Sequence, residues 1–123
     1  MKTALVIEDN DNNMKLITFL LEKHGFLTIR AKTGWKGVEM AINDKPDFII
    51  LDIQLPDIEG TQVLQEIRKR ETEECIPIIA MTSYAMSGDR QRLLGAGCNG
   101  YIEKPIDPVT VVDQIKEIIG DQG

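Results

Sequence analysis

The chain has 123 residues, of which 42% are hydrophobic and 28% charged, and its formal net charge is -6 at pH 7. This length predicts one domain with its own core, and the composition is typical of soluble globular proteins. The acidic balance argues against unaided binding to nucleic acid, because neutralising phosphates requires clustered Lys and Arg. The densest basic run, Arg68 to Arg70, is interpreted as the cationic end of a helix followed by a solvated loop.

Three continuous apolar runs predict buried strands, at residues 3–7, 48–51 and 76–81. Unbroken runs of Val, Ile and Leu are typical of a parallel sheet that helices cover on both faces. Residues 26–30 and 100–102 are weaker strand candidates, expected nearer the sheet edges. The first run soon reaches acidic residues, which makes it too short for a signal peptide or a membrane span. We therefore expect a cytoplasmic protein.

Apolar residues at helical spacing predict helices between these strands. Asp11 is expected to cap the first helix and Gly25 to close it. The apolar stripes that mark the first three helices are Met14, Ile17 and Leu21, then Trp35, Val38 and Ile42, then Val63, Leu64 and Ile67.

A fourth helix is expected from Ser87 to about Ala96, and a fifth after the last strand. Asp107 is placed to cap the fifth helix, with Pro108 at its first position. Its predicted buried face consists of Val111, Val112, Ile115, Ile118 and Ile119. Strands alternating with helices five times predict a doubly wound parallel α/β fold with right-handed crossovers. We expect a single domain over residues 1–123, without an output domain.

The stretch GAGCNG, Gly95 to Gly100, fits the G-x-G-x-x-G pattern of dinucleotide-binding folds. That pattern binds a pyrophosphate only when it follows a strand and opens a helix. Here it follows a predicted helix and precedes a predicted strand, so no nucleotide site is expected. Gly95 or Gly97 is instead expected to end the helix in the left-handed conformation.

Polar side chains follow the ends of four predicted strands. Glu8 and Asp9 follow the first strand and Asp52 follows the third. Thr82 ends the fourth strand, and Lys104 follows the fifth. Ligands of open α/β sheets bind beyond the carboxyl ends of the strands, where these groups would meet.

This combination of groups suits phosphoryl transfer. Crowded carboxylates resist ionisation without a cation, and oxygen ligands at an open site favour Mg²⁺. A carboxylate beside the metal can form an aspartyl-phosphate, while Lys104 and the Thr82 hydroxyl stabilise the charge of the transferred group. Two of these residues also have simpler interpretations, Asp9 as a helix cap and Lys104 as a solvated lysine. Asp52 does not suit the role of a cap, because the next helical pattern starts only near Thr61.

Four stretches of the sequence resemble the receiver domains of two-component response regulators. They are IEDND (residues 7–11), DIQLPDIEG (52–60), AMTSYAM (80–86) and YIEKP (101–105). The resemblance extends over essentially the whole chain, and with no output domain it is closest in kind to single-domain receivers. It implies five parallel strands in the order 2-1-3-4-5.

The resemblance also implies roles for the site residues. Asp52 would accept a phosphoryl group from a phosphohistidine on a histidine kinase or a histidine phosphotransfer protein. Asp9 and Asp52 would bind Mg²⁺ together with the backbone carbonyl of Gln54, and Glu8 would act mainly through water. Lys104 would pair with a phosphoryl oxygen, and its bond to the following proline should be cis.

Two further residues are implied to form the switch. Thr82 would move to bond the phosphoryl group, and Tyr101 would rotate inward. These movements would change the face of the fourth helix, fifth strand and fifth helix, where a downstream partner binds. The resemblance implies a phosphoacceptor regulator that takes part in its own phosphotransfer and slow autodephosphorylation, rather than an enzyme. Receivers often carry alanine after the switch hydroxyl, where this chain has Ser83. Gln54 and Tyr84 stand at positions that, in this family, tune the lifetime of the phosphate.

Other classes of protein are alternatives to this interpretation. Phosphatases with an aspartate nucleophile usually carry a second Asp two residues later, where this chain has Gln54. In a flavodoxin-like mononucleotide site, the acidic first loop, residues 8–11, would repel the phosphate of the ligand. An interaction module that never takes phosphate, or a receiver belonging to a hybrid histidine kinase, stays open from the sequence.

Overall fold

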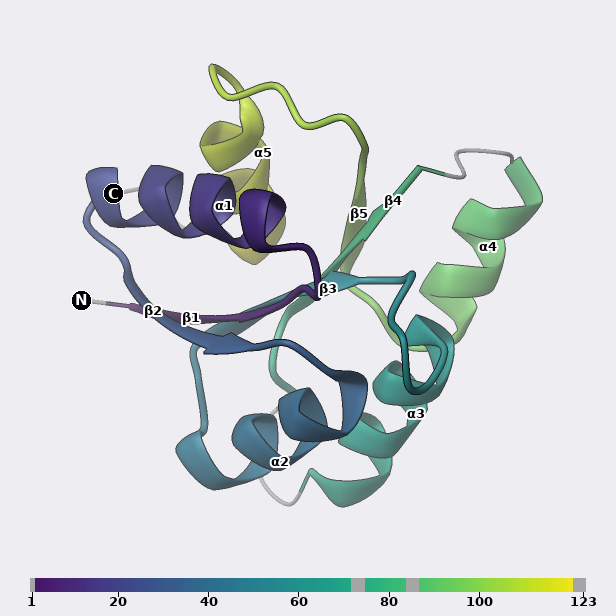
Figure 1. Cartoon of the computed structure of the whole chain (residues 1–123). Coiled ribbons are helices and arrows are strands. Elements are labelled where there is room, and N and C mark those ends of the chain that lie inside the picture. The colour runs from purple at the N-terminus through teal and green to yellow at the C-terminus, as the bar shows by residue number, and fades with distance from the viewer. Residues whose placement is uncertain (1, 72–74, 84–86, 121–123) are drawn as a thin grey trace.

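A computed structural model describes residues 2–71, 75–83 and 87–120, and over these residues the chain forms five strands and five helices (Figure 1). The strands are β1 (Thr3–Ile7), β2 (Leu27–Ala31), β3 (Phe48–Asp52), β4 (Ile78–Thr82) and β5 (Gly100–Glu103). The helices are α1 (Asp11–Lys23), α2 (Gly34–Asp44), α3 (Gly60–Arg70), α4 (Ser87–Gly95) and α5 (Val111–Ile119). All strand pairs are parallel, in the order β2-β1-β3-β4-β5, which confirms the predicted fold class and strand order.

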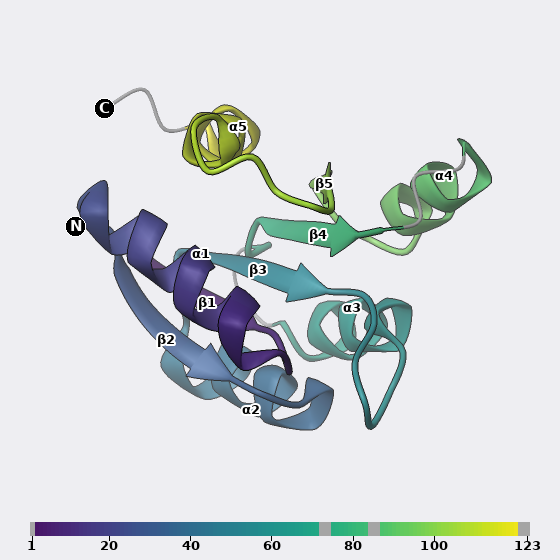
Figure 2. The ribbon, with the colours of Figure 1, turned by 45° about the horizontal axis from the view of Figure 1, so that its top comes forward.

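Helices cover both faces of the sheet. α1 and α5 lie on one face, and α2 and α3 on the other (Figure 2). Successive strand residues point to opposite faces, so the sheet separates two apolar clusters. Ile50 belongs to the cluster beneath α1 and α5, whereas Ile49 and Leu51 belong to the cluster beneath α2 and α3. β3 is buried along its whole length, as the unbroken apolar run predicts.

The ends of several elements differ from the prediction. β4 begins at Ile78 rather than at residue 76. Pro77 has no N–H to give to the ladder, although its carbonyl accepts a bond of 2.9 Å from the Ile49 N–H. α1 is capped by Asn10, whose Oδ1 accepts the Asn13 N–H at 3.0 Å, and Asp11 is the first helical residue. The prediction that Asp11 is the cap is therefore wrong by one position.

The start of α5 also corrects the prediction. Asp107 Oδ1 accepts the Val109 N–H at 2.9 Å, so it caps a turn that precedes the helix. α5 itself begins at Val111, and Pro108 lies in that turn instead of at the first helical position. The turn closes when the Asp107 carbonyl accepts the N–H groups of Thr110 and Val111. The buried face of α5 starts at Val111, as predicted.

α2 packs on the sheet through only part of its predicted apolar stripe, because Val38 is buried, as predicted, whereas Trp35 is not. Trp35 remains 43% exposed, while two glycines of the helix are buried. A Cβ at Gly37 would lie 2.4 Å from Cδ1 of Ile7, so the helix backbone approaches the sheet too closely for a large side chain. The prediction that Trp35 lies on the packed stripe is therefore wrong.

The glycine-rich stretch GAGCNG joins α4 to β5, the reverse of a dinucleotide site. Gly97 has a φ of +117°, which confirms that a glycine ends this helical region in a left-handed conformation. Among the helices of the described residues, none has the length and apolar character needed to cross a membrane.

Candidate functional site

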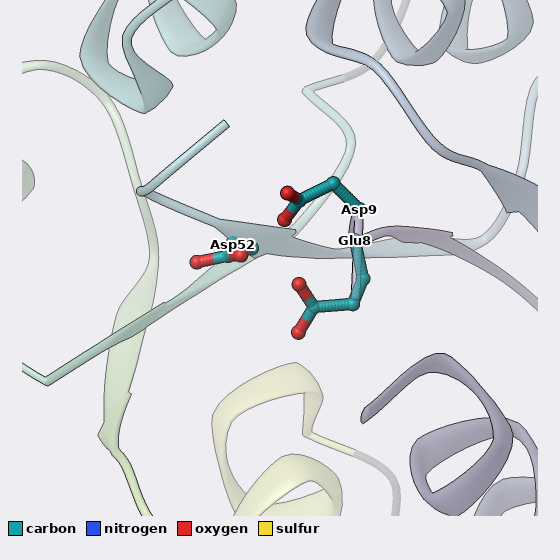
Figure 3. Close-up of side chains that lie close together, drawn as sticks. All are labelled: Glu8, Asp9 and Asp52. Atoms are coloured by element: carbon teal, nitrogen blue, oxygen red, sulfur yellow. The ribbon is translucent and has the colours of Figure 1, made fainter. Parts of the chain in front are cut away.

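Three carboxylates meet at the carboxyl ends of β1 and β3. The two strands are neighbours in register, with Ile7 opposite Leu51, so the residues that follow them come together. One oxygen from each of Glu8, Asp9 and Asp52 lies within 4.8 Å of the others (Figure 3). Glu8 and Asp52 are buried, whereas Asp9 is exposed. The cluster is therefore anchored in the sheet but open on one side.

Lys104 brings the opposite charge from the end of β5. Its Nζ lies 3.0 Å from Oδ1 of Asp52 and 3.5 Å from Oε1 of Glu8. Its backbone N–H donates to the carbonyl of Thr82 at 2.9 Å, and this bond ties the end of β5 to the end of β4. The Lys104–Pro105 peptide bond is cis. The ammonium is thus held against the buried carboxylates by the ends of two strands.

The carboxylates outnumber the cation at this site, and the pKa of Glu8 shows the consequence. Burial is the largest cause that raises the pKa of Glu8 from 4.5 to about 7, followed by the hydrogen bond and the negative charge of Asp52. The Lys104 ammonium acts in the opposite direction but does not offset these effects. A further cation at this position would therefore be stabilised.

The loop after β3, residues 53–59, begins by turning around Asp52. The Gln54 N–H donates to Oδ1 of Asp52 at 3.0 Å, so this oxygen receives both the amide and the Lys104 ammonium. The Gln54 side chain accepts a hydrogen bond of 3.3 Å from Oγ of Ser83, which links the two rims of the site. Tyr84, also expected at the rim, lies outside the described residues.

The two predicted switch residues lie on neighbouring strands. Thr82 is buried at the carboxyl end of β4, beside the strand that ends in Asp52. Tyr101 lies on β5, half-buried against the apolar cluster beneath α2 and α3. The structure thus gathers Glu8, Asp9, Asp52 and Lys104 into one site with Thr82 at its edge, and it places Tyr101 on the neighbouring strand β5.

The sequence did not point to Asp57, which joins the loop after Asp52 to α2. Its Oδ1 accepts the Gly34 N–H at 2.8 Å, and its Oδ2 accepts the Trp35 N–H at 3.0 Å. Aspartate after a proline is common in turns, so its presence in a loop carries no signal of a contact with another element. The contact becomes visible only in the structure, where the loop lies beside the start of α2.

The donor set suits a hard divalent cation. All three acidic side chains offer carboxylate oxygens, and the exposed Asp9 leaves room for water. Mg²⁺ is typically bound by one or two carboxylates and retains several water molecules, so the residues present fit this ion.

Comparison with known proteins places this geometry in context. The family of response regulator receiver domains matches residues 4–116. The polar-differentiation response regulators DivK of Brucella ovis and Brucella abortus are 40% identical over 120 residues, which cover 98% of this chain and 98% of theirs.

Solved structures give the same result. The receiver domain of a Pseudomonas aeruginosa sensor histidine kinase, solved with a magnesium ion coordinated in its active-site cleft, is 33% identical. It aligns with a TM-score of 0.87 over 97% of this chain and 98% of that chain. A putative response regulator from Chloroflexus aurantiacus is 26% identical, with a TM-score of 0.89 over 97% of this chain and 98% of its own.

Proposed function

The chain belongs to the response regulator receiver domains, and from this membership we propose that it is a phosphorylation switch with Asp52 as the acceptor. The family comprises signalling domains rather than classical enzymes. The observation that carries the proposal is the position of Asp52, buried at the centre of the carboxylate cluster with the Lys104 ammonium 3.0 Å from its Oδ1.

The proposed reaction is a phosphoryl transfer from a phosphohistidine. A carboxylate oxygen of Asp52 forms the new bond to phosphorus while the bond from phosphorus to the histidine nitrogen breaks. The hydrogen bond from the Gln54 N–H orients the carboxylate, and the Lys104 ammonium stabilises negative charge on the phosphoryl oxygens. The donor is a histidine kinase or a histidine phosphotransfer protein.

Mg²⁺ is the proposed cofactor. Asp9 and Asp52 would hold it together with the backbone carbonyl of Gln54, and Glu8 would contribute through water. When bound, the metal neutralises the carboxylates and the incoming phosphoryl group. The raised pKa of Glu8 supports this assignment, because it reflects a carboxylate that is buried first of all and lies beside a second carboxylate, Asp52. The magnesium in the cleft of the Pseudomonas receiver gives independent support.

The proposed output is a change of surface. Thr82 would bond the phosphoryl group and Tyr101 would turn inward, which biases the face of α4, β5 and α5 toward a downstream partner. Slow autodephosphorylation would then reset the switch in the cytoplasm. Thr82 at the edge of the site and the half-buried state of Tyr101 are the observations that support these two roles.

The test is intact-protein mass spectrometry after incubation with acetyl phosphate and Mg²⁺. The wild type should gain one phosphoryl group, and Asp52→Asn should gain none. Labelling of Asp52→Asn to the same extent would contradict the choice of acceptor. If neither acetyl phosphate nor a phosphohistidine donor labels the wild type, the phosphorylation proposal fails and a receiver-fold interaction module is the better description.

The metal has its own test, which does not depend on phosphorylation. Mg²⁺ should raise the melting temperature of the wild type, because it binds only the folded carboxylate cluster. Asp9→Ala should lose this shift. A melting temperature that millimolar Mg²⁺ leaves unchanged would count against the metal site.

A further inference from the structure

The first turn of α2 is completed by a residue from another element. The N–H groups of Gly34, Trp35 and Lys36 precede the first helical bond, so no helical carbonyl can accept them. Thr33 Oγ1 accepts the Lys36 N–H at 3.2 Å. The other two N–H groups donate to the two carboxylate oxygens of Asp57, at 2.8 and 3.0 Å. Asp57 therefore supplies two of the three side-chain bonds that cap this helix.

Asp57 also supplies the charge that the helix lacks. The first turn of α2 contains no acidic residue, although the positive end of a helix dipole favours one. Burial alone would raise the pKa of Asp57, but the N–H groups of Trp35 and Gly34 lower it below its ordinary value. The carboxylate is thus ionised when it bonds the helix.

The loop that carries Asp57 is closed at its base. The Gly60 N–H donates to the Ile53 carbonyl at 3.0 Å, and a Cβ at Gly60 would lie 2.5 Å from Cα of Ile53. This close contact fastens the two ends of residues 53–59 together. Farther along, the loop lies beside the start of α2 (Figures 1 and 2), where a Cβ at Gly34 would lie 2.6 Å from Cγ1 of Ile58. Asp57 adds the polar attachment at this second point.

The segment between Asp57 and the phosphoacceptor site is short and stiff. Only Leu55 and Pro56 separate Asp57 from Gln54. The proline ring fixes its own φ and restricts the residue before it to extended conformations. Gln54 in turn bonds Asp52 through its N–H. A displacement of Asp57 would therefore shift the backbone of Gln54, which bonds Asp52, because the two residues between them allow little change of conformation.

We propose that Asp57 is a positioning residue of the phosphoacceptor site: by fastening residues 53–59 to α2, it holds the Gln54 backbone where Mg²⁺ requires it. The inference rests on the proposed function for the identity of the site. Residues that orient metal ligands typically contribute about 10- to 100-fold to metal affinity. Asp57 acts through the loop and touches neither the metal nor the phosphoryl group.

The experiment compares Asp57→Ala and Asp57→Asn with Thr33→Ala. All three variants weaken the same helix cap, but only the first two loosen the loop. Titration calorimetry with MgCl₂ should show affinity reduced about tenfold in Asp57→Ala. The reduction should be smaller in Asp57→Asn, whose amide oxygen retains one acceptor. Thr33→Ala should bind Mg²⁺ within about twofold of the wild type while melting at a lower temperature.

Two further measurements separate positioning from general damage. Amide hydrogen exchange without metal should show faster exchange at Gly34, Trp35 and residues 53–59 in Asp57→Ala, with the sheet unchanged. At saturating Mg²⁺, the rate of labelling by acetyl phosphate should return toward the wild-type value. Asp57→Asn keeps the test decisive if Asp57→Ala does not fold.

Two results would overturn the inference alone: Asp57 variants that bind Mg²⁺ as the wild type does, or Thr33→Ala that loses as much affinity as Asp57→Ala. The second result would show that Asp57 acts only as a cap of α2. A wild type that binds no Mg²⁺ would be a different failure, because it removes the proposed metal site and this inference with it.

Discussion

The two ends of the sheet each hold a cation among oxygen atoms, but the balance of charge differs between them. At the carboxyl ends of the strands, Lys104 faces the cluster of Glu8, Asp9 and Asp52. At the amino ends, the side chain of Arg68 on α3 is 20% exposed, and its guanidinium contacts the carboxylate of Glu71 at 2.6 Å. Its other acceptors are neutral: Gly97 O at 3.0 and 2.7 Å, Ile76 O at 2.8 Å and Asn99 Oδ1 at 2.9 Å.

This difference shows how a structural ion network can be distinguished from a binding site. Around Arg68, the described residues place one carboxylate and neutral carbonyls against one guanidinium, so the charges of these residues balance. Around Lys104, among the described residues, three carboxylates face one ammonium, and the pKa of Glu8 is raised to about 7. The excess negative charge leaves room for a further cation, and perturbed carboxylates of this kind gather at functional sites.

Removing the ammonium from the carboxyl end should have the largest effect. Lys104→Met should slow labelling of Asp52 by acetyl phosphate about 100-fold, because the charge of the transferred phosphoryl group loses a fixed partner. Time-resolved mass spectrometry at saturating Mg²⁺ measures the rate. Lys36→Met, at a lysine whose side chain is 57% exposed, is the control and should label at the wild-type rate. A Lys104→Met rate within a few-fold of the wild type would remove Lys104 from the reaction.

Removing the cation from the amino end should affect stability instead. Arg68→Met deletes the bonds to two backbone carbonyls and to Asn99, and leaves Glu71 with the Ile76 N–H but without its cation. We expect a loss of about 2–3 kcal/mol in the free energy of unfolding, measured with urea. Mg²⁺ affinity should stay within about twofold of the wild type.

The matched control lies two residues away on the same helix. The side chain of Arg70 is 52% exposed and forms an ion pair of 3.2 Å with Glu66. Arg70→Met should therefore cost less than about 0.5 kcal/mol. Equal losses in the two arginine variants would show that the Arg68 network contributes no more than an exposed ion pair. Weaker Mg²⁺ binding in Arg68→Met would show that the two ends are not independent.

The smallest expected effect concerns pH. The pKa of Glu8 is raised from 4.5 to about 7, so between these values the folded state holds a proton that the unfolded state has released. Without metal, this stabilisation is fully present below pH 4.5 and is lost as the pH rises through about 7. We expect a loss on the order of 1 kcal/mol after solvent screening, seen in urea unfolding at pH 5 and pH 8.

Glu8→Gln is the control for the pH effect, because its side chain cannot titrate. The difference between its stability at pH 5 and at pH 8 should be smaller than in the wild type by the contribution of Glu8. Saturating Mg²⁺ should stabilise the wild type more at pH 8 than at pH 5, since the metal favours the ionised carboxylate. It should therefore counteract the loss of stability that occurs without metal as the pH rises. Identical pH profiles for the wild type and Glu8→Gln without metal would contradict the raised pKa.

The sequence predicts the fold well, because the signals for strands and helices are local. The apolar runs locate the strands, and polar residues directly after them locate the carboxyl end of the sheet. Helix caps are less certain, since adjacent Asn10 and Asp11 are equally good caps and only the backbone selects between them. Trp35 shows another limit: periodicity identifies apolar positions but not how closely a helix packs.

The predicted site residues come together for a related reason, since each ends a strand of the same parallel sheet. Arg68 and Asp57 could not be placed in this way. Arg68 bonds a carbonyl 29 positions away, and Asp57 bonds an amide 23 positions away. Such pairings follow no period, because they depend on how intervening loops place two elements. Arg68 lies in the cationic last turn of a helix, as the sequence predicts, but its contacts across the amino end of the sheet were not predicted.

The cap that Asp57 provides also bears on how the protein is made. A growing chain leaves the ribosome from its N-terminus, so α2 is synthesised 23 residues before the carboxylate that completes its first turn. Until Asp57 has been synthesised, the N–H groups of Gly34 and Trp35 lack the carboxylate that accepts them in the folded protein. The native cap of α2 therefore forms only after the chain has reached the loop beside the phosphoacceptor.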